Sequence, residues 1–383
     1  MSWILVAVTS AILLWSPIVA AGSADLMARA AEAERAGDLD HAIELYGRTI
    51  EDAGSMDAVR VDAMMRRATV LEHLGHQEGA LTDYDTVLAL QPDNALAYNN
   101  RGRLRADLGR YRDAIADYDE ALRLDATLGV AHDNRGAAWA ALGNYEAAIA
   151  DYNAALEIDP DHANAWNNRG GAYAQMGQFE RAIADYDRAI ALAPDFPYAF
   201  KNRGQSLLML GAFDRALADF DRAIELDRGL ASAFNGRGFA WFAKGELSRA
   251  IADYDEALRL DPALAEAYNG RGATYASEGQ LDQAIADFDQ AIALKPRLAA
   301  AYDNRAMVHL TKGNYRAAIE DFDTALRLDP TYVPSLRSRG LAHERLGQLA
   351  EAERDYGSAL GLQANDPSLK AALERVRLHL RNL

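Results

Sequence analysis

The sequence predicts an all-α solenoid, a fold in which short helical hairpins stack one after another. The main observation is a 34-residue unit that occurs nine times without a gap between Val61 and Asp366. Three residue types fix its register. Arg precedes each repeated Gly by eight residues, Ala follows it by five, and the Gly residues stand at 75, 109, 143, 177, 211, 245, 279, 313 and 347. A fixed period of this size is typical of proteins in which each unit packs only on its neighbours.

Each unit is predicted to form two helices joined by a tight turn. In residues 163–196, numbered 1 to 34, Gly177 at position 15 suits the left-handed conformation that ends a helix. Pro194 at position 32 ends the second helix. The apolar faces consist of positions 4, 8 and 11 and positions 20, 24, 27 and 28, which are Trp166, Gly170, Tyr173, Ala182, Tyr186, Ala189 and Ile190. One hairpin cannot bury this surface alone, so neighbours must stack.

Two further segments flank the nine units. Residues 25–60 look like a tenth, degenerate copy, because Gly37 stands where position 15 would fall. Gly37 and Gly75 are 38 residues apart, so four extra residues, around Asp57 to Arg60, are expected in the loop between the hairpins. Residues 367–383 have apolar residues near helical spacing with basic residues between them, which predicts a helix that caps the solenoid.

Residues 1–21 differ from the rest of the chain. The 19 residues from Trp3 to Ala21 carry no charge and end in small residues, with Val19-Ala20-Ala21 as a candidate processing site. This pattern predicts a secretory signal peptide. The alternative is a retained N-terminal membrane anchor at residues 3–21, because no Lys or Arg precedes the run and its length can span a bilayer. The Ala-, Arg- and Asp-rich composition then suggests an exported bacterial protein, periplasmic or secreted.

Composition argues against several functional classes. The 383 residues carry a formal net charge of −17, whereas a nucleic-acid-binding protein needs a basic surface that displaces counterions. The chain has no Cys, which removes disulfides, thiolate catalysis and zinc–thiolate sites. No Gly-rich phosphate loop, nucleophile elbow or H-E-x-x-H motif occurs. We therefore expect neither an enzyme nor a bound metal or cofactor.

The unit resembles the tetratricopeptide repeat (TPR) family, whose consensus has aromatic residues at 4, 11 and 24, small residues at 8, 20 and 27, Gly at 15 and Pro at 32. Nine copies match, over about four fifths of the chain. The departures are Ala126, Arg228 and Ala364 at position 32, and Arg instead of the usual Leu at position 7. The resemblance implies a right-handed superhelix whose concave surface is built from the first helix of each hairpin. It also implies an adaptor or scaffold.

The resemblance indicates which residues line the concave groove. Positions 2, 5, 6, 9, 12 and 13 point away from the apolar face, and position 6 is often Asn: Asn100, Asn134, Asn168, Asn202 and Asn304. Position 5 adds further Asn residues. An amide side chain donates and accepts, so a row of them can pair with the backbone of an extended peptide, as in some family members. The alternative is that these side chains bond to neighbouring helices or face water.

A second candidate site lies where the Asn row is interrupted by Gly236 and Gly270. An apolar patch is expected there, with a basic residue nearby; its members are Lys201, Leu208, Met209, Phe239 and Phe242. Exposed apolar clusters often mark partner sites, and aromatic residues dominate binding hot spots. The alternative is packing between successive first helices. The clamp for chaperone C-termini known in this family is disfavoured, because Gln205 stands where it needs Asn.

The repeated Arg at position 7 flanks the apolar face and therefore needs a counter-charge. Asp at position 23 is equally regular, from Asp83 to Asp355, so we predict Arg–Asp pairs between the two helices of each hairpin. The alternative is an Arg row that binds an anionic partner. Asp at position 25, as in Asp119 and Asp187, is predicted to lie on a solvated outer face.

These features predict a non-catalytic scaffold for protein–protein interaction that holds an extended peptide segment or a partner helix in its groove. The Asn row would pair with the peptide backbone, and the patch at Phe239 and Phe242 would anchor a side chain. The alternative is a structural or assembly subunit of an envelope complex, whose acidic convex face and array ends make the contacts. A membrane contact is expected only if residues 3–21 are retained as an anchor.

Overall fold

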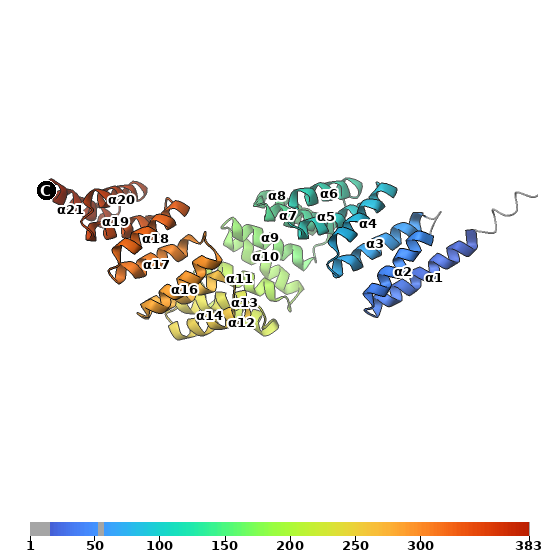
Figure 1. Cartoon of the computed structure of the whole chain (residues 1–383), viewed down its shortest axis with the longest axis horizontal. Helices are drawn as coiled ribbons and strands as arrows, with labels where there is room; N and C mark the ends of the chain where they lie inside the picture. Colours follow the sequence, from blue (N-terminus) through green and yellow to red (C-terminus); the bar gives the residue numbers. More distant parts are fainter. Residues whose placement is uncertain (1–15, 53–56, 383) are drawn as a thin grey trace, which may run out of the picture. The chain divides into compact units, whose positions relative to one another are not determined.

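The computed structural model describes residues 16–52 and 57–382, and this part of the chain contains helices and no strand (Figure 1). The chain divides into two compact units, Met1–Leu192 and Ala193–Leu383. The helices of the first unit are α1 (Ser16–Arg35), α2 (Leu39–Asp52), α3 (Asp57–His73), α4 (Gln77–Leu90), α5 (Ala95–Asp107), α6 (Tyr111–Leu124), α7 (Gly129–Ala141), α8 (Tyr145–Ile158), α9 (Ala163–Gln175) and α10 (Phe179–Leu192).

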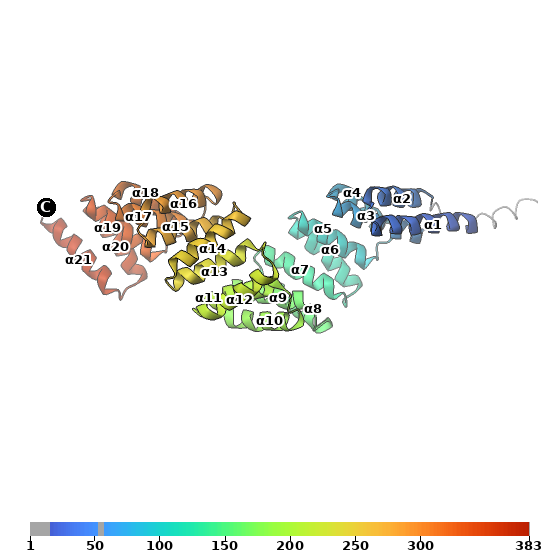
Figure 2. The same ribbon diagram turned by 90° about the horizontal axis from the view of Figure 1, so that it is seen from below.

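The second unit contains α11 (Pro197–Met209), α12 (Phe213–Leu226), α13 (Ala231–Ala243), α14 (Leu247–Leu260), α15 (Ala265–Ser277), α16 (Leu281–Leu294), α17 (Ala299–Thr311), α18 (Tyr315–Leu328), α19 (Val333–Arg345), α20 (Leu349–Leu362) and α21 (Pro367–Arg381). In both units consecutive helices form hairpins, such as α5 with α6 and α15 with α16, and each hairpin packs on the next within its unit (Figures 1 and 2). The predicted all-α array of stacked hairpins is confirmed.

The turn inside each hairpin depends on glycine. Ten Gly residues at position 15, from Gly37 to Gly347, have φ between 72° and 80°, a conformation that costs other residues about 1–2 kcal/mol. In the copy that starts at residue 163, the backbone N–H of Gly177 donates to the carbonyl of Ala174 (3.0 Å), and that of Gln178 donates to Tyr173 (2.9 Å). These bonds satisfy carbonyls at the end of the first helix, as expected for a left-handed cap.

Small residues let the two helices of a hairpin approach closely. A Cβ atom on Gly170 would lie 2.8 Å from the ring of Tyr186, so only glycine allows this separation. Ala182, on the facing helix, is fully buried. The aromatic residue at position 24 fills the centre of every copy and is almost fully buried in each: Tyr84, Tyr118, Tyr152, Tyr186, Phe220, Tyr254, Phe288, Phe322 and Tyr356. Each hairpin therefore has its own small core.

The N-terminal part of the array differs from the prediction at the start of α3. The four residues Asp57–Arg60, expected in a loop, form the first turn of α3, which is 17 residues long, whereas the first helices of the later copies have 13. Asp57 supplies an acidic residue at the helix start, which the helix dipole favours. At the other end, the Asp366 carboxylate accepts hydrogen bonds from the N–H groups of Ser368 and Leu369, which caps α21.

The predicted signal or anchor segment is only partly described. Residues 3–15 lie outside the described part of the chain, and α1 begins at Ser16. None of the helices in residues 16–52 and 57–382 has the length and apolar character needed to cross a membrane. Sequencing the N-terminus of protein purified from cells would distinguish a cleaved segment from a retained one.

Candidate protein-binding face

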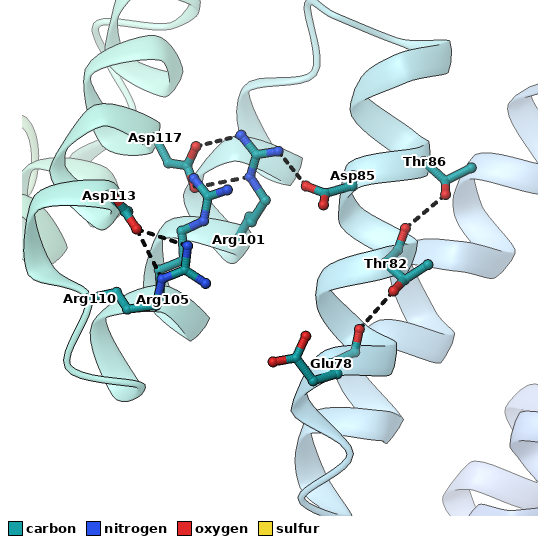
Figure 3. A network of polar contacts seen from close by, with 9 residues as sticks. All are labelled: Glu78, Thr82, Asp85, Thr86, Arg101, Arg105, Arg110, Asp113 and Asp117. Atoms are coloured by element: carbon teal, nitrogen blue, oxygen red, sulfur yellow. Dashed lines mark hydrogen bonds and ion pairs between the residues drawn. The ribbon is translucent and has the colours of Figure 1, made fainter.

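The Arg residues at position 7 lie between helices and are bound by carboxylates. In Figure 3, Arg101 from α5 donates from Nε and Nη2 to the Asp117 carboxylate of α6, at 3.0 and 2.6 Å. The same two-bond pair forms in all nine copies, between Arg67, Arg101, Arg135, Arg169, Arg203, Arg237, Arg271, Arg305 and Arg339 and the Asp 16 residues later. The predicted Arg–Asp pairs are confirmed.

Seven of these guanidinium groups, from copies two, three, four and six to nine, also donate to the preceding hairpin. Arg101 Nη1 donates to Asp85 of α4 at 2.6 Å (Figure 3), and Arg135 Nη1 donates to Asp119 at 2.6 Å. Asp119 lies on an exposed face, as predicted, but it also binds the Arg of the next copy, which was not predicted. Hydrogen bonds to Asp253, opposed by burial, raise the pKa of Arg237. The Arg row is thus used inside the array, where it links three helices at a time.

Aromatic residues at position 4 cover six of the nine guanidinium groups. The Arg169 guanidinium lies 4.5 Å from the ring centroid of Trp166, and that of Arg271 lies 5.6 Å from the ring of Tyr268. Such contacts add a cation–π attraction to the ion pair. With a carboxylate on one side and, in most copies, a second oxygen acceptor and an aromatic ring beside it, these Arg side chains are poorly placed to bind an anionic partner.

The Asn side chains on the first helices bond to one another between neighbouring copies. Asn134 donates to Asn99 Oδ1 at 3.1 Å, and Asn304 donates to Asn269 Oδ1 at 3.0 Å. Asn168 donates in the same way to Asp133, at 3.3 Å. Position 6 of one copy thus contacts position 5 of the copy before it.

The remaining members of the row take part in bonds within one copy. Asn100 accepts from Asn99 at 3.2 Å, and Asn202 accepts from Lys201 Nζ at 2.5 Å. Burial lowers the pKa of Lys201, which is half-buried on α11. Binding of a peptide backbone by the Asn side chains at position 6 stays a prediction. A bound peptide would have to replace the hydrogen bonds between the helices, or accept from the amide N–H groups that those bonds do not use.

The apolar residues predicted for the groove are only partly accessible. We define the first-helix face as the surface of the second unit built from α11, α13, α15, α17 and α19, which are adjacent in that order. Met209 is 59% exposed and Phe239 48% exposed, whereas Phe242 is half-buried. Leu208 is 5% exposed, so it cannot present a contact surface, contrary to its prediction as a binding residue.

Two cavities open next to α17. The first, of about 270 Å³, lies between α13, α15, α16 and α17, and we call it the apolar cavity; its walls include Phe242, Ala273, Ala276, Met307 and Val308. The second, of about 240 Å³, is the acidic cavity, lined by Ala299, Ala300, Asp303, Ala325, Asp329 and Tyr332. Asn304 lines both cavities, so they adjoin one another. Met307, which is 41% exposed, was not singled out from the sequence.

The sequence matches models of one repeat family over most of its length. Models described as TPR repeat or tetratricopeptide repeat match residues 95–128, 136–177, 163–196, 197–230, 240–277, 265–298 and 304–368. A comparison with curated proteins found no match.

Solved structures with the same fold are distant in sequence. A chain in the crystal structure of the APC/C hetero-tetramer Cut9-Hcn1 is 16% identical with a TM-score of 0.61, and the match covers 95% of this chain and 86% of that one. A monomeric IFIT1 mutant with Gppp-AAAA is 18% identical with a TM-score of 0.58, covering 84% and 82%. A tetratricopeptide repeat protein from Parabacteroides merdae is 21% identical with a TM-score of 0.54, covering 65% and 98%. At these identities the likeness concerns the fold alone.

Proposed function

Because the chain belongs to the tetratricopeptide repeat family, whose scaffold is typical of protein–protein interaction, we propose that it is a non-catalytic scaffold that binds a protein partner on the first-helix face. The bound element is a peptide segment or a helix of the partner. A repeat array suits this role, since each hairpin adds a similar strip of surface and the whole can follow an elongated ligand.

The observation that carries the proposal is the set of exposed apolar side chains on three first helices of the second unit. Met209, Phe239 and Met307 come from α11, α13 and α17, and each is at least 41% exposed. Large apolar side chains in water are unfavourable when they cluster, and such clusters commonly mark contact sites. Phe and Met are among the residue types enriched in the centres of protein interfaces. The apolar cavity beside Phe242 and Met307 offers a depression into which a partner side chain can insert.

Two members of the Asn row, Asn202 on α11 and Asn304 on α17, supply polar groups along the same face. Asn304 stands between the two cavities, and its amide already donates to Asn269. An amide in this position still has a second N–H and a carbonyl oxygen for a partner backbone. We therefore assign anchoring to the apolar residues and orientation of the bound segment to the Asn side chains.

The test compares capture of a native partner by the full chain and by variants that keep the fold. Phe239→Glu with Met307→Glu places charge on the exposed apolar surface and is expected to weaken binding about tenfold or more. Leu294→Glu is the matched control, since Leu294 is 43% exposed on the second helix α16. Partners would be isolated by cross-linked pull-down, and affinity measured by biolayer interferometry after unchanged helicity is verified.

Partner binding on the first helices and partner binding on the second helices are expected to give opposite results in this comparison. A partner lost in the double variant and kept by Leu294→Glu supports binding on the first-helix face. Full binding by the double variant, with loss in Leu294→Glu, would move the site to the second helices and support an assembly role. A third variant, Asn202/Asn304→Ala, measures what the Asn side chains of this face contribute.

A further inference from the structure

The acidic cavity contains a carboxylate, Asp303, that forms no salt bridge with any Lys or Arg in the described part of the chain. Asp303 is half-buried, and burial raises its pKa, while a hydrogen bond from Ser335 acts in the opposite direction. Among the described residues, the Ser335 hydroxyl gives the only hydrogen bond to this carboxylate, and no Lys or Arg forms a salt bridge with it. A partly buried charge is costly unless it is paired. Asp303 therefore differs from the Asp residues at position 23, which all bind Arg.

Asp133, the Asp at the same position of another hairpin, has a hydrogen-bond donor on the next copy that Asp303 lacks. Asp133, also at position 5 of its copy, accepts from Asn168 of the next copy at 3.3 Å, and the charge of His162 acts to lower its pKa against the effect of burial. The residue of the last copy that corresponds to Asn168 is Ser338. Among the described residues its shorter side chain gives Asp303 no hydrogen bond, so the carboxylate, which accepts only from Ser335, can accept from an external donor as well.

The rest of the acidic cavity suits a long basic side chain. Ala299, Ala300 and Ala325 form small apolar walls along which the aliphatic stem of Lys or Arg can lie. Tyr332 is 43% exposed, and its ring offers a cation–π contact. The pKa of Tyr332 is raised by burial and by the carboxylates of Asp303 and Asp329. The negative charges of both carboxylates therefore act on the acidic cavity at Tyr332. Among the described residues no Lys or Arg forms a salt bridge with Asp329 either.

We propose that the partner segment bound on the first-helix face carries a basic residue and an apolar residue a few positions apart, with the basic side chain in the acidic cavity and the apolar side chain in the apolar cavity. This inference rests on the proposed function and names the chemistry of its ligand. A cation supplies the counter-charge that Asp303 lacks, whereas an acidic side chain would add repulsion. The apolar residue covers Phe242 and the exposed Met307.

The geometry of α17 sets the spacing of the two residues. Asp303 and Met307 are four residues apart on one helix, which corresponds to a rise of about 6 Å. Two residues of an extended strand span about 6.6 Å, and four residues of a helix span about 6 Å. The recognised pattern is therefore basic-x-apolar, in either direction, for an extended segment, or basic-x-x-x-apolar for a helix.

A synthetic peptide array tests this pattern with defined probes. The array holds 12-residue peptides in which Leu or Phe is separated from Lys or Arg by zero to five residues, together with matched sets carrying Gln or Glu in place of the basic residue. Binding of the labelled full chain is measured on the array, and selected peptides are then titrated by fluorescence anisotropy. Basic peptides with one or three intervening residues are expected to bind about tenfold to a hundredfold more tightly than their Gln counterparts.

Variants at position 5 assign the preference to Asp303. Asp303→Asn keeps the shape and the acceptor for Ser335, and it is expected to remove the advantage of basic peptides. Asp303→Lys is expected to reverse the preference towards the Glu set. Asp133→Asn, the same change at the same position of another hairpin, should leave the preference for basic peptides unaltered. Helicity is compared for all three.

Two results would overturn the inference. One is equal binding of the basic and Gln sets, or no binding of any peptide. The other is a preference for basic peptides that Asp303→Asn leaves intact. If the native partner is still lost in Phe239→Glu with Met307→Glu, only the basic-plus-apolar pattern falls and the proposed function stands. If the partner also ignores that double variant, both fall.

Discussion

Replacing Arg237 by Met is expected to destabilise the second unit by about 3–5 kcal/mol, because it leaves a buried carboxylate without its counter-charge. Arg237 donates to Asp253 at 2.9 and 2.7 Å, and the Asp253 side chain is only 9% exposed. Arg237 Nη1 also donates to Asp221 of α12 at 2.6 Å, so the substitution loosens the contact between two hairpins as well. Guanidinium unfolding followed by circular dichroism measures the loss.

A double variant and a surface control make this prediction specific. Adding Asp253→Asn to Arg237→Met removes the unpaired charge and should recover part of the stability. Arg259→Met is the control, because Arg259 is exposed and, in the part of the chain that the structure describes, pairs only with Glu256 on the same helix, so little change is expected. Equal effects of Arg237→Met and Arg259→Met would show that the Arg row does not hold the hairpins together.

Gly236→Asn should be the second strongly destabilising substitution, although Asn is the usual residue at position 6. A Cβ atom on Gly236 would lie 2.5 Å from Cζ of Phe220, and that ring is fully buried. Real Cβ atoms essentially never approach so closely, so the ring or α13 must move. Overpacking of this kind costs about 1–3 kcal/mol, and Asn offers little gain in helix propensity over Gly. A lower midpoint of guanidinium unfolding is the expected result.

A glycine in another helix with free space around its Cβ position is expected to gain stability when it is replaced by alanine. A Cβ atom on Gly357 in α20 meets no other atom within 4 Å. Gly357→Ala should therefore stabilise the chain by up to about 1 kcal/mol, through helix propensity alone. If Gly236→Asn were neutral while Gly357→Ala was stabilising, the close approach of α13 to Phe220 would not matter for stability.

The hairpins and their Arg–Asp pairs were predictable because both recur with the 34-residue period. Arg101 and Asp117 are 16 residues apart, and this separation repeats in every copy. The second partner, Asp85, lies 16 residues before Arg101, so the sequence contained a symmetric signal for it. That signal was missed because an Asp on the outer side of a helix normally faces water. Only the packing of one hairpin on the next brings it to an Arg.

The candidate site was predictable only in part, for a physical reason. Helix geometry correctly placed Met209 and Phe239 on the surface. The burial of Leu208 depends on how closely neighbouring helices approach, which periodicity does not encode. The same holds for the acidic cavity, since Tyr332 lies 29 residues from Asp303 and meets it only through the stacking of α17, α18 and α19. Cavities reflect the volume that side chains leave empty, and a helical pattern cannot give that volume.

The most direct test of partner binding on the first-helix face is site-specific photo-cross-linking in cells. A photoreactive amino acid would replace Phe239 or Met307 on the first-helix face, and Gln290 on the second helix α16 as an exposed control. We predict cross-links to one partner protein from positions 239 and 307 and none from position 290. Cross-links to that partner from position 290 alone would contradict the account and place the contact on the second helices.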